Sequence, residues 1–144
     1  MKLAYTIVLG AALMIPPAFA QTQADPIASL PAAKIAGQVQ YVTGGVGQEE
    51  ADAFRNAQRD YSLALEFGNK AKPRAQFTAG VNVLIRDARG NTVLDVVSDG
   101  PFLLAKLPAG RYTIRATQNG KTLDRVATVS GGKSTHVAFL WQDE

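Results

Sequence analysis

Hydrophobic and polar residues alternate with a period of two along most of the chain after residue 60. In the stretch YSLALEF, Leu63, Leu65 and Phe67 fall on one side, and Ser62 and Glu66 fall on the other. Neighbouring side chains of a β-strand point to opposite faces, so this alternation predicts a half-buried strand. Similar apolar segments predict strands at 34–42, 61–67, 79–87, 92–98, 102–107, 111–117, 122–130 and 134–141.

One segment has a helical period instead. In QEEADAFRNAQRDY, the residues Ala51, Phe54, Ala57 and Tyr61 recur at spacings of three, three and four. This spacing places them on one face of an amphipathic helix. Acidic residues crowd its beginning, where the helix dipole favours negative charge. We therefore predict one helix, at about 48–60.

Turn signals separate the predicted strands at regular intervals. Gly-Pro precedes the apolar run FLLAKL, Pro-Ala-Gly follows it, and ARGN, QNGK and GGK mark further turns. Pro101 has no N–H to donate to a continuing ladder. Turns about 8–12 residues apart are typical of a β-sandwich. The prediction is a single all-β domain, an antiparallel Ig-like or prealbumin-like β-sandwich of about seven to eight strands with one added helix.

The N-terminus has the pattern of a secretory signal peptide. Lys2 precedes an apolar run that ends in Ala18-Phe19-Ala20, an A-x-A cleavage site. We expect a signal peptide at 1–20, a flexible leader at 21–34 and the domain at 35–144. The protein would then be periplasmic or secreted after cleavage near Ala20, and would contact a membrane only through that peptide; an uncleaved anchor is the alternative.

Composition narrows the classes of partner and of chemistry. There is no cysteine, which excludes disulfides and a lipid-modified cysteine. The 15 basic and 12 acidic side chains are interspersed, whereas a nucleic-acid-binding protein would concentrate its positive charge. The densest basic group, Lys70, Lys72 and Arg74, is interpreted as a solvated loop.

Three motifs between residues 81 and 117 resemble those of the carboxypeptidase regulatory-like domain. They are VNVLIRDARGNTV (81–93), SDGPF (98–102) and LPAGRYTIRA (107–116). The resemblance implies a prealbumin-like sandwich in which Tyr112 is a core aromatic. It also implies an accessory module without catalytic residues, found beside a peptidase, before a receptor barrel or in surface proteins. The segment 43–67 is not part of the familiar domain.

Reactive residues are few. His136 is the one histidine, so the usual cysteine–histidine pair and a histidine-rich zinc site are not indicated. Gly44-Gly45-Val46-Gly47 precedes the helix but lacks the Gly-Lys-Ser/Thr of a phosphate loop. Glu49 and Glu50 follow it, where they would repel a phosphate. We therefore expect no cofactor, no metal and no enzymatic activity.

The predicted function is that of a non-catalytic binding or accessory module, acting by recognition of another envelope or secreted protein. Its surface would be formed by loops and strand edges on a rigid scaffold. Candidate binding residues are Tyr41, Gly44, Gly45, Glu50, Arg55, Lys70, Lys72, Arg74 and Trp141.

Two alternatives are weighed against this function. A carbohydrate-binding module would hold a polysaccharide on coplanar exposed aromatics, with Trp141 and either Tyr41 or Phe102 among them. A small hydrolase, the less favoured alternative, would bring carboxylates together across a cleft. Its candidates are Asp95, Asp99 and Asp124.

Overall fold

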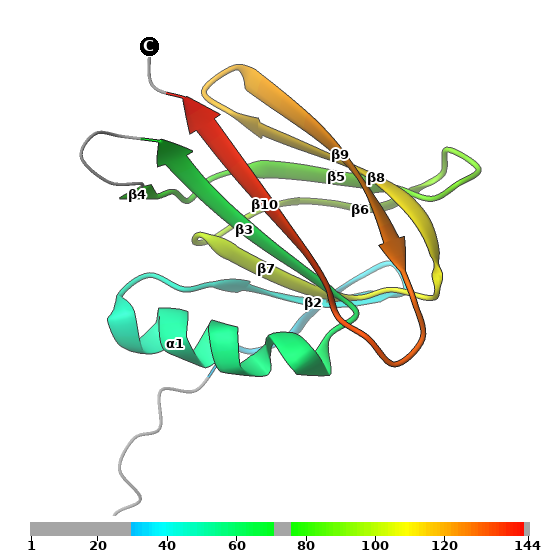
Figure 1. The fold of residues 1–144 in the computed structure, drawn as a ribbon, viewed down its shortest axis with the longest axis horizontal. Coiled ribbons are helices and arrows are strands. Elements are labelled where there is room, and N and C mark those ends of the chain that lie inside the picture. The colour runs from blue at the N-terminus through cyan, green and yellow to red at the C-terminus, as the bar shows by residue number, and fades with distance from the viewer. Residues whose placement is uncertain (1–29, 71–75, 143–144) are drawn as a thin grey trace, which may run out of the picture.

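The chain folds as an all-β sandwich of two sheets with one helix against an outer face (Figure 1). This computed structural model describes residues 30–70 and 76–142, so the predicted signal peptide, Lys72 and Arg74 lie outside the described residues. The first sheet has the order β1 (Lys34–Ala36), β2 (Val39–Gly44), β7 (Phe102–Lys106), β3 (Leu63–Lys70) and β10 (Thr135–Gln142), and β4 (Gln76–Phe77) also pairs with β3. The second has the order β6 (Thr92–Val97), β5 (Asn82–Arg86), β8 (Gly110–Gln118) and β9 (Lys121–Val129).

The sandwich and its helix confirm the predicted fold class. Helix α1 spans Gln48–Ala57, and a 3₁₀ turn continues it over Gln58–Asp60, which matches the predicted 48–60. The strand number exceeds the prediction, because the short β1 and β4 bring the described strands to ten. The pairing differs too, since β10 runs parallel to β3 while the other ladders are antiparallel.

The expected single strand at 34–42 is wrong, because the chain turns back on itself there. Gly37 has a φ of 59°, in the left-handed region that favours glycine. The turn lets β1 pair with β2 as a hairpin, with Ala36 opposite Val39. Ahead of this hairpin, Leu30 packs against the apolar residues under the helix, so the end of the expected leader contacts the domain.

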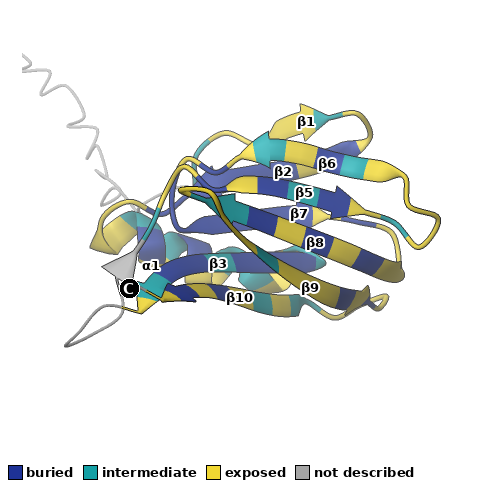
Figure 2. Cartoon of the chain, turned by 90° about the horizontal axis from the view of Figure 1, so that it is seen from above, coloured by how far each residue is buried: buried dark blue, intermediate teal, exposed yellow. Residues whose placement is uncertain are grey.

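The main core lies between the two sheets. Along β8 and β10 buried and exposed residues alternate, as the striped ribbons in Figure 2 show. The largest fully buried side chains of this core include Phe67, Phe139, Leu65, Ile85 and Ile114. A half-buried sheet on each side of an apolar layer is the arrangement that the period-two alternation predicts.

A second, smaller core fills the space between α1 and the outer face of the first sheet. Phe54 of the helix stacks on Phe102 of β7, with ring centroids 5.6 Å apart. The period-two alternation places Ala64 with Glu66 on the face of β3 expected to contact solvent. Ala64 is nevertheless only 2% exposed. The prediction of a half-buried β3 is therefore wrong for most of the strand. The reason is that the helix covers the second face.

Tyr112 connects the turn before β8 to the core. Its ring is buried, and its hydroxyl donates a hydrogen bond to the carbonyl oxygen of Pro108 at 2.6 Å. A tyrosine that bonds back to the backbone a few residues upstream is a known corner device of β-sandwiches. Burial, and then the charge of Asp87, raises the pKa of Tyr112 above its ordinary value of 10.0.

Tyr112→Phe is expected to lower the free energy of unfolding by about 1 kcal/mol at neutral pH, because the carbonyl of Pro108 loses its donor. A raised pKa means that the folded state favours the neutral phenol. The contribution of Tyr112 is therefore complete below pH 10.0 and is lost as the pH rises through the folded-state pKa. Urea denaturation of both proteins at neutral and alkaline pH measures this. A constant difference between them across that range would contradict it.

Candidate functional site

Three of the predicted binding residues meet at the beginning of α1, and a fourth, Arg55, lies in its last turn. Gly44 ends β2, Gly45 follows it, and Glu50 and Arg55 come from the helix. The backbone N–H of Gly45 donates to Oε1 of Glu50 at 2.7 Å. This bond holds the loop between β2 and α1 against the first turn of the helix, and it places a carboxylate where the helix dipole is positive.

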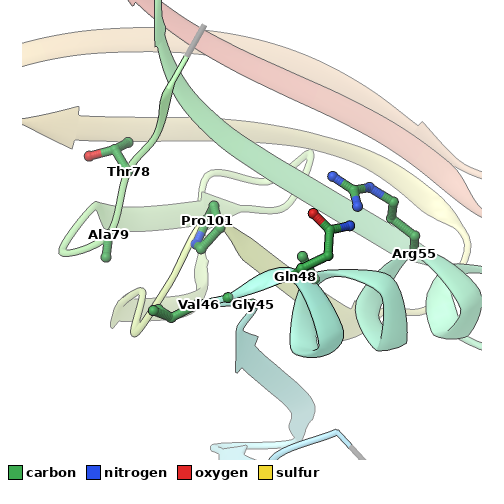
Figure 3. A pocket seen from close by; sticks show the side chains of 9 residues that line it. Gly45, Val46, Gln48, Arg55, Thr78, Ala79 and Pro101 are labelled. Atoms are coloured by element: carbon green, nitrogen blue, oxygen red, sulfur yellow. The ribbon is translucent and has the colours of Figure 1, made fainter. Parts of the chain in front are cut away.

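A surface hollow of about 410 Å³, which we call the helix hollow, opens beside this loop. In Figure 3, Gln48 and Arg55 project from one side of α1, and Thr78, Ala79 and Pro101 lie across from them. The residues that line the hollow are Gly45, Val46, Gly47, Gln48, Ala51, Arg55, Thr78, Ala79 and Pro101.

Glycine shapes the wall of the helix hollow. Gly45 has a φ of 98°, and a Cβ there would lie 2.4 Å from Cδ2 of Phe102. Gly47, at the start of the helix, has a φ of 91°. Larger residues would be strained at both positions, and one at Gly45 would also clash with Phe102. The glycines thus let the loop before α1 turn close to the Phe102 ring.

The helix hollow combines an apolar wall with one guanidinium group. Arg55 donates from Nη1 to Oδ1 of Asp52 at 2.9 Å, and its guanidinium carbon lies 5.6 Å from the centre of the Phe102 ring. The exposed Val46 stands at the rim. Such a surface suits an apolar side chain whose neighbour carries a carbonyl or carboxylate oxygen.

Sequence reasoning missed the far wall of this hollow. Thr78, Ala79 and Pro101 follow β4 or precede β7, far from the helix in the sequence. The Gly-Pro at 100–101 signalled a turn, but a turn signal does not say which element the turn will face. Only the folding of β7 beside β2 brings this turn to the helix.

The other predicted binding residues lie elsewhere. Tyr41 and Trp141 are buried in the main core, and Nε1 of Trp141 donates to the carbonyl oxygen of Lys121 at 3.0 Å. Lys70 lines a second hollow, the strand hollow, of about 660 Å³ between β9 and β10. Lys121, Leu123, Arg125, Ala138, Leu140, Trp141 and Gln142 complete its lining.

The aromatic residues required for carbohydrate binding are not exposed. Tyr41, Phe102 and Trp141 are 9%, 0% and 4% exposed, respectively. A sugar-binding platform needs the flat face of the ring at the surface, and these rings instead pack in the two cores. The structure therefore contradicts the expectation that these three residues form such a platform.

The three candidate carboxylates of a hydrolase do not converge. Asp95 and Asp124 lie on β6 and β9, the two edge strands of one sheet, and two strands separate them. Asp124 accepts from Nε of Arg115 at 2.8 Å, and this bond lowers the pKa of Asp124. Asp99 pairs with Lys34 at 3.0 Å. Within residues 30–70 and 76–142, no group of three His, Cys, Asp or Glu side chains could hold a metal ion.

Comparison with known proteins adds no family to these observations. No protein-family model matches the chain, and no curated protein matches it. In the described part of the chain, no helix combines the length and the apolar character needed to span a membrane.

Proposed function

We propose that this chain is a non-catalytic binding module that recognises a segment of another envelope or secreted protein. The helix hollow would receive an apolar side chain of that segment, and Arg55 would meet an oxygen atom beside it. The resemblance to carboxypeptidase regulatory-like domains supports an accessory role. The hollow adjoins the part of the chain, 43–67, that this resemblance does not cover.

The observation that carries the proposal is the construction of the helix hollow. Its walls come from three separate parts of the chain, which are the loop before α1, the segment after β4 and the turn before β7. Phe54 and Phe102 hold the helix to the sheet beneath it, so the hollow is largely preformed. Because the residues around a preformed hollow are already ordered, binding of a partner's side chain costs them little conformational entropy.

Photocrosslinking in the producing cell tests the proposal. A photoreactive amino acid in place of Val46, at the rim, is expected to give one discrete adduct with a partner protein. Val97 is the matched control, because it is also an exposed valine, 55% exposed against 67%, and belongs to the other sheet. Equal adducts from both positions would show that contact at the helix hollow is not specific.

Filling the hollow should abolish the adduct. Ala79 is exposed and lines the hollow, so Ala79→Trp adds a large ring at the rim without replacing a core residue. The expected result is an adduct yield at least about tenfold lower, as for the loss of a central contact of an interface. Val126→Trp, on the solvent face of β9, should leave the yield unchanged. An adduct that survives Ala79→Trp would overturn the proposal.

A further inference from the structure

A third hollow lies at the other end of α1, where the helix meets the start of β10. Its volume is about 360 Å³, and we call it the basic hollow. The residues that line it are Arg55, Asn56, Gln58, Arg59, Gly132, Ser134 and His136. The helix and its 3₁₀ extension supply one wall, and the β9–β10 turn with the first residues of β10 supplies the other.

The lining of the basic hollow is rich in hydrogen-bond donors. Its ionisable members are two arginines and the one histidine of the chain, and none of the seven lining residues is acidic. Asn56 and Gln58 add amide groups that can donate. A guanidinium group has five donors and no acceptor, so this lining is complementary to a ligand that accepts hydrogen bonds and carries negative charge.

Ser134 provides an independent sign of an absent partner. Its Oγ is buried and has no hydrogen-bond partner in the described part of the chain. Buried polar groups in native proteins are nearly always paired, so such an atom calls for an explanation. Since Ser134 also lines the basic hollow, an oxygen atom bound there, of a ligand or of an ordered water, would supply the missing partner.

The backbone around Ser134 and His136 is fixed by hydrogen bonds. The N–H of Thr135 donates to the carbonyl oxygen of Ser62 at 2.9 Å, and the hydroxyl of Thr135 donates to the carbonyl oxygen of Thr128 at 2.8 Å. These bonds tie Thr135, which lies between Ser134 and His136, to β9 and to the residue just before β3. The start of β10, which supplies Ser134 and His136 to the basic hollow, is therefore held in place before any ligand binds.

We propose that the basic hollow binds a phosphate or sulfate group, either as the free ion or as an ester on a larger ligand. Arg59 supplies one guanidinium group and Arg55, which also pairs with Asp52, supplies a second, and donors on both walls suit the tetrahedral oxygens of such a group better than the planar oxygens of one carboxylate. This inference goes beyond the proposed protein partner. It needs only the basic hollow.

His136 makes the test direct, because its ring signals in a nuclear magnetic resonance spectrum belong to the one histidine of the chain. Inorganic phosphate and sulfate, added at constant pH and ionic strength, are expected to shift these signals saturably, with a midpoint of about 1–10 mM. Acetate at equal ionic strength should shift them less. Absence of a saturable shift, or tighter binding of acetate, would overturn the proposal.

Arg59→Gln should weaken binding at least about tenfold, because one charge-assisted contact is removed. Arg111→Gln is the matched control, since it removes the same charge from an exposed position on β8 and should leave the midpoint unchanged. Equal weakening by both variants would indicate diffuse attraction and contradict a site. Thermal melts of both variants show that each is folded.

Two further measurements place the ion and identify its carrier. Trp141, the one tryptophan of the chain, lines the strand hollow together with Lys70 and Lys121. A change in tryptophan fluorescence without a change in the His136 signals would place the ion in the strand hollow and overturn the proposal. Phenyl phosphate that binds as tightly as phosphate supports an ester ligand. Binding of the free ion alone supports a site for the ion itself. Arg59 does not line the helix hollow, so its variant leaves the crosslinking test unaffected.

Discussion

Gly100→Ala is expected to lower the free energy of unfolding by about 3 kcal/mol. Gly100 is buried in the turn before β7, where its Cα faces the backbone of Gly44 at the end of β2. A Cβ on Gly100 would lie 2.3 Å from the carbonyl oxygen and 2.4 Å from the carbonyl carbon of Gly44. These are backbone atoms of a paired strand, so they cannot rotate away as a side chain would.

Gly131→Ala is the matched control for this prediction. Gly131 lies in the β9–β10 turn, and a Cβ there would meet nothing within 4 Å. Its replacement should change the free energy of unfolding by less than about 0.5 kcal/mol. Urea denaturation of the two variants measures the difference. Equal midpoints would show that the turn before β7 moves to accept a methyl group, and the close contact with Gly44 would then carry no cost.

Phe54→Ala is expected to cost about 3–5 kcal/mol, the usual range for removing a buried phenylalanine. The Phe54 side chain is fully buried and stacks on Phe102, with an angle of 15° between the rings. It is the largest residue that α1 contributes to the second core. Its loss leaves a cavity between the helix and the sheet, which the small neighbours Ala51 and Ala64 cannot fill.

The measurement is urea denaturation followed by circular dichroism, with Val126→Ala as the control. Val126 is 56% exposed, so its truncation should cost less than about 0.5 kcal/mol. Phe54→Leu retains much of the buried volume and should fall between the two. A cost below about 1 kcal/mol for Phe54→Ala would mean that contacts other than the second core hold the helix.

The helix, the strands and the turns could be predicted because the signals for them are local in the sequence. The spacing of Ala51, Phe54 and Ala57 defines a helical face wherever the helix lies. Alternation in Val83 and Ile85 defines the buried side of β5 in the same way, and both residues are fully buried. Turn residues act over a few positions of the chain, and Gly90, in the predicted ARGN turn, has the positive φ that such a turn requires.

Candidate sites were harder to predict, because their residues meet only in space. Gly44, Gly45 and Glu50 lie together because they belong to one short segment, and Arg55, in the last turn of α1, lines the helix hollow with Gly45. Pro101 and Ala79 joined them without a local signal. His136 is exposed on β10, and nothing in the sequence around it indicated that Arg59 would line the same hollow.

Local sequence patterns located the helix, most of the strands and the turns between them, because side-chain period and turn chemistry depend on neighbours within a few residues. Only long-range packing made α1 cover β2, β3 and β7, paired β10 in parallel with β3, and formed the helix hollow, the strand hollow and the basic hollow. Strand pairing and burial depend on contacts between residues far apart in the chain, and no local period encodes which of them will meet.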